Sequence, residues 1–413
     1  MKRIVLITNL LFANATLFGQ DSLVTQLLAK HSKPIAITNN SLSGDGAQWL
    51  QSQLENTQFV LVGEDHGIAE LPQFVGALYS DLYEKGFNHF VTEAAPGALP
   101  QLLKMASQPD LSEFESFNKK HPFSIPFYSW QEESEMLRNI YHTNNMASNS
   151  IWALDQEFIV SSRAHFEKLA MNAKNATAKK IAQEYQAKAT ALLDEAIKTQ
   201  NFGSNLMFTL TPDDFNALTE AFSDQPEAVS LINGLKESQS IYFKMGSDPY
   251  QSNIDRIALM KKNFYKYYNK AKETEKLPKA IFKFGAIHTS RGASLLNIFD
   301  LGNMASELAN SNGKESFHIL VVGVEGESNK YMLMNDSSLK NAKYSGKKEL
   351  NGLGLDPIFD LAEGNEWKMI DLSQLKNDIW LSKIEVSDEL KKTVYAYDAV
   401  LLIPQVTAAT NFE

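Results

Sequence analysis

The fold of this chain is decided by the stretch FVLVGEDHG at residues 59–67. Four apolar residues typical of a buried strand lead into a glycine turn, and the turn brings a carboxylate, Glu64, close to an imidazole, His66. In an open α/β sheet, ligands bind at the carboxyl ends of the parallel strands. The placement of this pair directly after a strand therefore predicts a functional site, although Glu64 alone would also suit the N-terminus of a following helix.

Three later strand-like runs end in the same kinds of residue. They lead into Glu93, Asp155 and His288. If these strands are parallel neighbours, all of these groups converge on one edge of the sheet. Such a cluster suits two kinds of chemistry: an imidazole held by a carboxylate can activate water as a general base, and the same groups can bind a divalent metal whose water becomes the nucleophile.

The alternation of strands with amphipathic helices predicts an α/β fold with a mainly parallel central sheet flanked by helices. A helix over 69–85 joins the first two strands as a βαβ unit. Residues 160–275 are rich in Ala, Lys, Glu and Gln, and we expect them to form a helical insertion. By contrast, 106–128 and the end of 21–45 are expected to be loops. Strands are expected at 59–62, 88–92, 151–154, 280–284, 317–324, 367–371 and 399–403.

The composition excludes several classes of protein. The 413 residues carry a net charge of −10, and the one basic stretch, at 261–270, is interpreted as a solvated helix face rather than a nucleic-acid contact. The chain has no cysteine, which excludes disulfides, thiolate zinc sites and cysteine nucleophiles. Its 44% hydrophobic content is that of an ordinary globular protein.

The N-terminus has the pattern of a targeting segment. Lys2 and Arg3 precede an apolar run at 4–18, which is short for a transmembrane helix. We interpret 1–20 as a secretory signal peptide and 21–413 as one domain of a periplasmic or secreted bacterial protein. No other stretch is expected to cross a membrane, so no integral membrane segment remains once the signal is removed.

Several short motifs occur in the order seen in a known group of proteins. They are GEDHG at 63–67 with Glu70, GF at 86–87 before Glu93, Trp130 and Glu135 before LDQ at 154–156, Arg256 with Met260 and Asn263, GAIH at 285–288, and YDAV at 397–400. Together they resemble the erythromycin esterase family, within a wider group that includes the haem-binding ChaN-like proteins and the Tiki metalloproteases. The single residue between Glu64 and His66 is closer to the ChaN-like spacing, since erythromycin esterases usually have two.

The resemblance implies hydrolysis of a small-molecule ester or lactone by an activated water, with no cofactor required. His66 is then the general base, Glu64 orients it, and Glu93 and His288 position the water or the substrate carbonyl.

The resemblance also implies residues that contact the substrate. Arg256 is expected to stabilise the oxyanion, because a preorganised positive donor lowers the cost of developing charge. Asp155 and Glu70 are the other expected substrate-binding residues.

Two alternatives follow from the other branches of the group. In a Tiki-type metal-dependent hydrolase or peptidase, a divalent ion would be held by Glu64, His66, Glu93 and His288. In a ChaN-like haem-binding protein, the absence of Cys leaves His, Tyr or Met as iron ligands.

Overall fold

The computed structural model describes residues 21–333 and 335–412, so the predicted signal peptide at 1–20 lies outside the described residues. The chain divides into two compact units, each built from separate stretches of sequence. Unit 1 comprises Met1–Leu78, Phe284–Glu327 and Lys343–Thr407. Unit 2 comprises Tyr79–Lys283, Ser328–Ala342 and Ala408–Glu413.

Unit 1 contains a mixed sheet in the strand order β2-β1-β9-β10-β7-β3, with β8 paired to β7. The neighbours β10, β7 and β3 are parallel, whereas β9, β1 and β2 pair antiparallel at one side. The strands of this unit are β1 (Ser32–Thr38), β2 (Ser41–Ser43), β3 (Thr57–Glu64), β7 (Glu315–Ser328), β8 (Ala342–Ser345), β9 (Trp367–Asp371) and β10 (Ala399–Val406).

Every residue of β3 is buried, as is the stretch Ser316–Gly323 of β7. Burial on both faces explains why these strands read as continuous apolar runs rather than alternating ones. Residues 21–30 are helical, and the named helices of unit 1 are α2 (Asp45–Gln53), α3 (Glu70–Tyr83, which crosses into unit 2), α13 (Ala286–Thr289), α14 (Leu301–Ser311), α15 (Gly346–Glu349), α16 (Asp356–Phe359), α17 (Ser373–Trp380) and α18 (Asp388–Ala396).

Unit 2 contains three parallel strands in the order β6-β4-β5. These are β4 (His89–Thr92), β5 (Ile151–Ala153) and β6 (Ala280–Gly285), and β6 carries the chain back into unit 1. The helices are α4 (Leu99–Ala106), α5 (Ser112–Lys120), α6 (Gln131–Thr143), α7 (Ser162–Asn172), α8 (Ala176–Thr199), α9 (Leu206–Thr209), α10 (Pro212–Ala221), α11 (Pro226–Ser247) and α12 (Pro249–Ala271).

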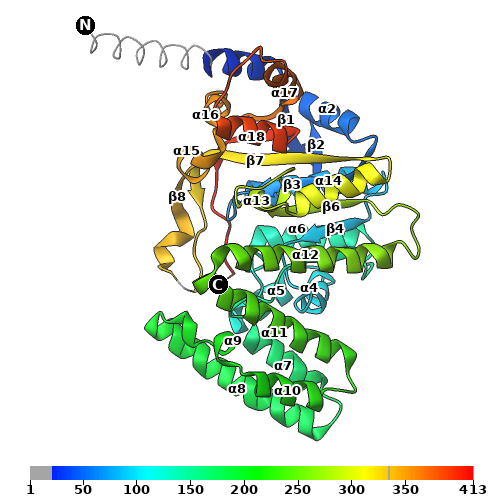
Figure 1. The fold of residues 1–413 in the computed structure, drawn as a ribbon, viewed down its shortest axis with the longest axis vertical. Helices are drawn as coiled ribbons and strands as arrows, with labels where there is room; N and C mark the ends of the chain where they lie inside the picture. Colours follow the sequence, from blue (N-terminus) through cyan, green and yellow to red (C-terminus); the bar gives the residue numbers. More distant parts are fainter. Residues whose placement is uncertain (1–20, 334, 413) are drawn as a thin grey trace. The chain divides into compact units, whose positions relative to one another are not determined.

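The helical insertion predicted at 160–275 is present as α7 to α12, and its described residues contain no strand. Figure 1 shows α7, α8, α10 and α11 packed side by side. Their shared core includes Phe166, Phe215, Phe222 and Leu235, all of which are buried. The insertion therefore has a hydrophobic core of its own, which accounts for its helical periodicity.

Two loop predictions were wrong. The loop expected at the end of 21–45 contains β1 and β2, and the loop expected at 106–128 contains α5. In β1 only Ile35 is buried and Pro34 interrupts the run, so the strand pattern is weak. Within α5 the buried residues are Phe114 and Asn118, which is too few to produce a clear helical period.

Candidate active site

The predicted pair of Glu64 and His66 forms at the end of β3 in unit 1. The distance from His66 Nδ1 to Glu64 Oε1 is 2.9 Å. The carboxylate side chain is 3% exposed, whereas the imidazole is 34% exposed. A buried carboxylate thus holds an imidazole that remains accessible from solvent.

This hydrogen bond decides which tautomer of His66 is favoured. A carboxylate oxygen can only accept a hydrogen bond, so the neutral ring carries its N–H on Nδ1 and donates it to Glu64. The lone pair of the ring then lies on Nε2, which is the atom that would take a proton from water. Glu64 also stabilises the imidazolium that such a transfer creates, by its opposite charge.

His288 forms a second pair of the same kind in unit 1. It lies in α13, just after β6, and its Nδ1 is 2.8 Å from Asp300 Oδ2. Asp300 is completely buried and precedes α14, where its other oxygen accepts the backbone N–H of Leu301. Sequence reasoning missed Asp300, although an acid just before an apolar helix is a recognisable helix-capping signal.

Gly63 explains how α13 comes to lie against the end of β3. A Cβ atom at this position would be 3.1 Å from the Cα of Ala286 and would collide with the side chain of Thr289. Only glycine allows α13 to approach this closely, because any side chain would push the two elements apart. Gly63 is therefore needed for this packing, whereas the positive φ of the turn belongs to Gly67.

Tyr344 lies beside the same motif and was not predicted. It is fully buried on β8, and burial together with the nearby charge of Asp65 raises its pKa. Its phenol is therefore neutral and can donate a hydrogen bond near the turn between Glu64 and His66.

Glu70 has partners of its own in unit 1. Its carboxylate accepts the backbone N–H of Thr407 at 3.0 Å and the hydroxyl of the same residue at 2.8 Å. These bonds tie the first turn of α3 to the residue that follows β10. The substrate-binding role of Glu70 stays a prediction.

Three of the predicted residues form an ion cluster in unit 2. The guanidinium of Arg256 donates to both oxygens of Asp155, with Nε at 2.9 Å and Nη2 at 2.7 Å. Nη2 also lies 2.8 Å from Glu93 Oε1. Burial alone would lower the pKa of Arg256, but the charges and hydrogen bonds of Asp155, followed by Glu93, raise it above its ordinary value.

The sequence pattern around Arg256 reflects how α12 packs onto the end of β5. Asn263, two turns further along, donates to the carbonyl of Leu154 at 2.8 Å. Met260 is completely buried between them, and Ile257 is also buried. The motif of Arg256, Met260 and Asn263 thus marks the face of α12 that docks on the strand end.

The predicted residues therefore fall into two groups. Unit 1 holds Glu64, His66, Glu70 and His288, whereas unit 2 holds Glu93, Asp155 and Arg256. The predicted metal-binding set draws on both groups. Across 21–333 and 335–412, no three His, Cys, Asp or Glu side chains are grouped so as to hold a metal ion, and we derive no step through one.

Comparisons with known proteins identify the fold. No protein-family model and no curated protein sequence matches the chain. Among solved structures, a protein from Bacillus cereus has a TM-score of 0.60 at 17% identity and covers 95% of this chain and 99% of its own. A succinoglycan biosynthesis protein has a TM-score of 0.57 at 13% identity, with the same two coverages.

A mutant of the erythromycin esterase EreC, in its open conformation, is also similar. Its TM-score is 0.55 at 13% identity, covering 89% of this chain and 95% of that protein. At these identities the likeness establishes the fold, which is a mixed α/β fold with a central sheet flanked by helices. This is the fold of an erythromycin esterase. In the described part of the chain, we find no helix with the length and apolar character needed to cross a membrane.

Proposed function

We propose that this protein is a hydrolase that cleaves a small-molecule ester or lactone by means of a water activated by His66. The observation that carries the proposal is the bond between the buried carboxylate of Glu64 and the accessible ring of His66. The likeness in fold to an erythromycin esterase supports it. The second pair, His288 with Asp300, supplies another oriented imidazole in the same unit.

The proposed reaction has two steps. Nε2 of His66 takes a proton from water while the water oxygen attacks the ester carbonyl, which gives a tetrahedral oxyanion and an imidazolium stabilised by Glu64. The oxyanion then collapses, the bond to the leaving alkoxide breaks, and the imidazolium returns its proton to that oxygen. The products are a carboxylic acid and an alcohol, and His66 is neutral again.

We assign Arg256 to holding Asp155 and Glu93, because its Nε and Nη2 already donate to these two carboxylates. A guanidinium committed in this way gives its neighbours a fixed position. The oxyanion role of Arg256 stays a prediction.

The decisive experiment is a hydrolysis screen read by mass spectrometry. Wild-type protein and the His66→Ala variant are incubated with macrolides, lactones, simple esters and peptides, with and without a chelator. A matched control is His31→Ala, which removes a half-exposed histidine of unit 1 that belongs to neither pair. We expect wild type and the control to add one water to an ester or lactone, regardless of chelator, and His66→Ala to lose this activity.

The other outcomes each contradict the proposal. Full activity of His66→Ala would remove His66 as the base. Peptide cleavage that the chelator abolishes would place the protein with metal-dependent peptidases. No turnover of any substrate, together with a specific absorbance change on adding haem, would make it a binding protein instead.

We also propose that the protein is exported. The support is the basic start at Lys2 and Arg3 followed by the apolar run at 4–18. Fractionation of a bacterial host that expresses the chain, followed by N-terminal sequencing of the recovered protein, tests this. We expect a shortened N-terminus in the periplasm or the medium, and an intact Met1 in the cytoplasm would contradict export.

A further inference from the structure

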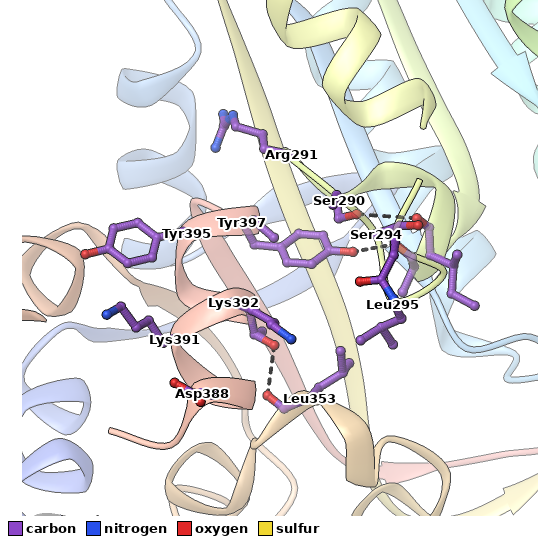
Figure 2. Close-up of a pocket in the computed structure, with 16 residues that line it drawn as sticks. Ser290, Arg291, Ser294, Leu295, Leu353, Asp388, Lys391, Lys392, Tyr395 and Tyr397 are labelled. Carbon is purple, nitrogen blue, oxygen red and sulfur yellow. Dashed lines mark hydrogen bonds between the residues drawn. The ribbon is translucent and has the colours of Figure 1, made fainter. Parts of the chain in front are cut away.

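A cavity in unit 1 lies outside both histidine pairs. It has a volume of about 570 Å³, and its walls come from α13, the loop that follows it, and α18. Figure 2 shows Leu295 and Ser294 on the loop, and Lys391, Lys392 and Tyr395 on α18. Cavities of roughly 300–1,000 Å³ are the usual size for small-molecule ligands.

The walls of the cavity are largely apolar and partly exposed to water. Ile287 is 36% exposed and Leu295 is 52% exposed, and both line it. Leu353 and Ala396 add further carbon surface. Covering such side chains with an apolar ligand releases the water that now contacts them, which favours binding.

Two hydroxyl groups in the wall, those of Tyr397 and Thr393, are already bonded within the protein. The hydroxyl of Tyr397 donates to the carbonyl of Ala286 at 2.6 Å. The hydroxyl of Thr393 donates to the carbonyl of Leu353 at 2.8 Å, which joins α18 to the opposite wall (Figure 2). These bonds hold the walls of the cavity in place. Because the two hydroxyls are engaged, a ligand would meet mainly the apolar side chains of the wall.

The rim of the cavity is positively charged. Lys391 and Lys392 both line it, both are exposed, and neither forms an ion pair with any residue of the described part of the chain. Asp388 is the acidic residue in the lining, while Arg291 is bound to Asp398. A local excess of positive charge is unusual in a chain with a net charge of −10 and favours an anionic ligand.

We propose that this cavity binds a small amphipathic carboxylate, such as a medium-chain fatty acid. The alkyl chain lies against Ile287, Leu295 and Leu353. The carboxylate lies beside the ammonium group of Lys392, which extends toward the side of Leu295 (Figure 2), and Lys391 adds positive charge at the rim. The proposal concerns a second site and does not depend on the hydrolysis proposed for His66.

The experiment is a calorimetric titration of the purified protein with decanoate and, separately, with decanol. We expect decanoate to bind at one site and decanol to bind at least tenfold more weakly. The double variant Lys391→Gln/Lys392→Gln should lose about tenfold in affinity for decanoate, since exposed ion pairs contribute modestly and two are lost. The matched control Lys348→Gln, an exposed lysine of unit 1 outside the cavity, should bind as wild type does.

A second variant tests the apolar wall. Leu295 is 52% exposed on a loop, so the variant Leu295→Asp should fold as wild type does. The new negative charge repels the carboxylate ligand and replaces part of the apolar wall, so decanoate binding should be abolished. Equal binding of decanol and decanoate, or unchanged binding by either variant, overturns the proposal. So does sedimentation with phosphatidylglycerol vesicles that requires Lys391, Lys392 and Leu295 in the absence of decanoate binding, because the patch would then be a membrane contact.

Discussion

The charge of Glu64 matters more to the proposed reaction than its shape. In the variant Glu64→Gln an amide replaces the carboxylate at 2.9 Å from His66, so the imidazolium loses its stabilising partner. We expect kcat to fall about 10²–10⁴-fold with KM little changed, which is the range typical of a lost acid–base contribution. Steady-state kinetics on the ester found in the screen measures this, and an unchanged kcat would contradict the role of Glu64.

Arg256 is expected to matter for stability, because it pairs with the buried carboxylate of Glu93 and the partly buried carboxylate of Asp155. The variant Arg256→Met removes the guanidinium that pairs with Asp155 and Glu93, and breaking such a pair costs about 3–5 kcal/mol in unfolding free energy. The measurement is urea denaturation followed by circular dichroism.

The control for this variant is Arg138→Met. Arg138 also donates to a carboxylate with two nitrogens, but its partner Glu135 is 43% exposed. An exposed pair contributes up to about 1 kcal/mol, so the control should lose little stability. If the two variants lose the same unfolding free energy, burial of the Arg256 cluster does not add to its contribution to stability.

At the scale of residues, the sequence identifies candidates better than it identifies their partners. Glu64 and His66 are two positions apart, so a single turn predicts their contact. His288 and Asp300 are separated by a loop, and no periodic pattern links them. The contact between Arg256 and Asp155 likewise depends on how α12 docks on β5, which composition and spacing do not encode.

The contact between β3 and α13 gives a prediction at the scale of elements. In Gly63→Ala the new methyl group collides with Thr289 and approaches Ala286, so α13 must shift. Overpacking of this kind costs about 1–3 kcal/mol. Because α13 carries His288, we expect hydrolytic activity to fall as well, which thermal unfolding and the ester assay together will measure.

Gly352→Ala is the matched control for this change. Gly352 is also in unit 1, and a Cβ there would have no neighbouring atom within 4 Å. We expect this variant to keep its stability and activity. If both alanine variants behave alike, the close approach of α13 to Gly63 has no energetic consequence.

The sequence predicts well the elements whose buried residues form a clear pattern, either a continuous apolar run or a regular helical repeat. The central strands β3 and β7 are apolar throughout, and α3 repeats its apolar residues every three or four positions. The short strand β2 and the helix α5 bury few residues, so their local pattern does not stand out from that of a loop.

At the scale of the molecule, His318 makes stability depend on pH. It is completely buried on β7, and burial, followed by the charge of Arg291, lowers its pKa to about 3. The unfolded chain takes up a proton on this histidine below about pH 6.5, whereas the folded chain does not until about pH 3. Its contribution is therefore complete above pH 6.5 and is lost as the pH falls toward 3.

We expect this residue to contribute a slope of about 1.4 kcal/mol per pH unit to the unfolding free energy over that range. The variant His318→Gln should be less stable at pH 7 but show a shallower slope. Urea denaturation at a series of pH values measures both, and parallel curves for the two proteins would show that His318 does not titrate in this way.

The α/β class of the whole molecule follows from the order of strands and helices along the sequence. The division into two units does not, because each is assembled from three separate stretches. Local patterns report on neighbours in sequence, whereas this division depends on contacts between distant segments. The same reasoning explains why the cavity beside α18, built from residues around 290 and 390, has no signature in the sequence.

The pairing of β3 with β7 has a consequence for how the chain acquires its structure during synthesis. Thr57 aligns with Glu315, so β3 leaves the ribosome long before its parallel neighbour exists. Pairing between such distant segments is intrinsically slow, and an unpaired apolar strand is prone to aggregate. The residues around Glu64 and His66 therefore reach their final geometry late, and a chaperone that shields the first sixty or so residues should raise the yield of folded protein.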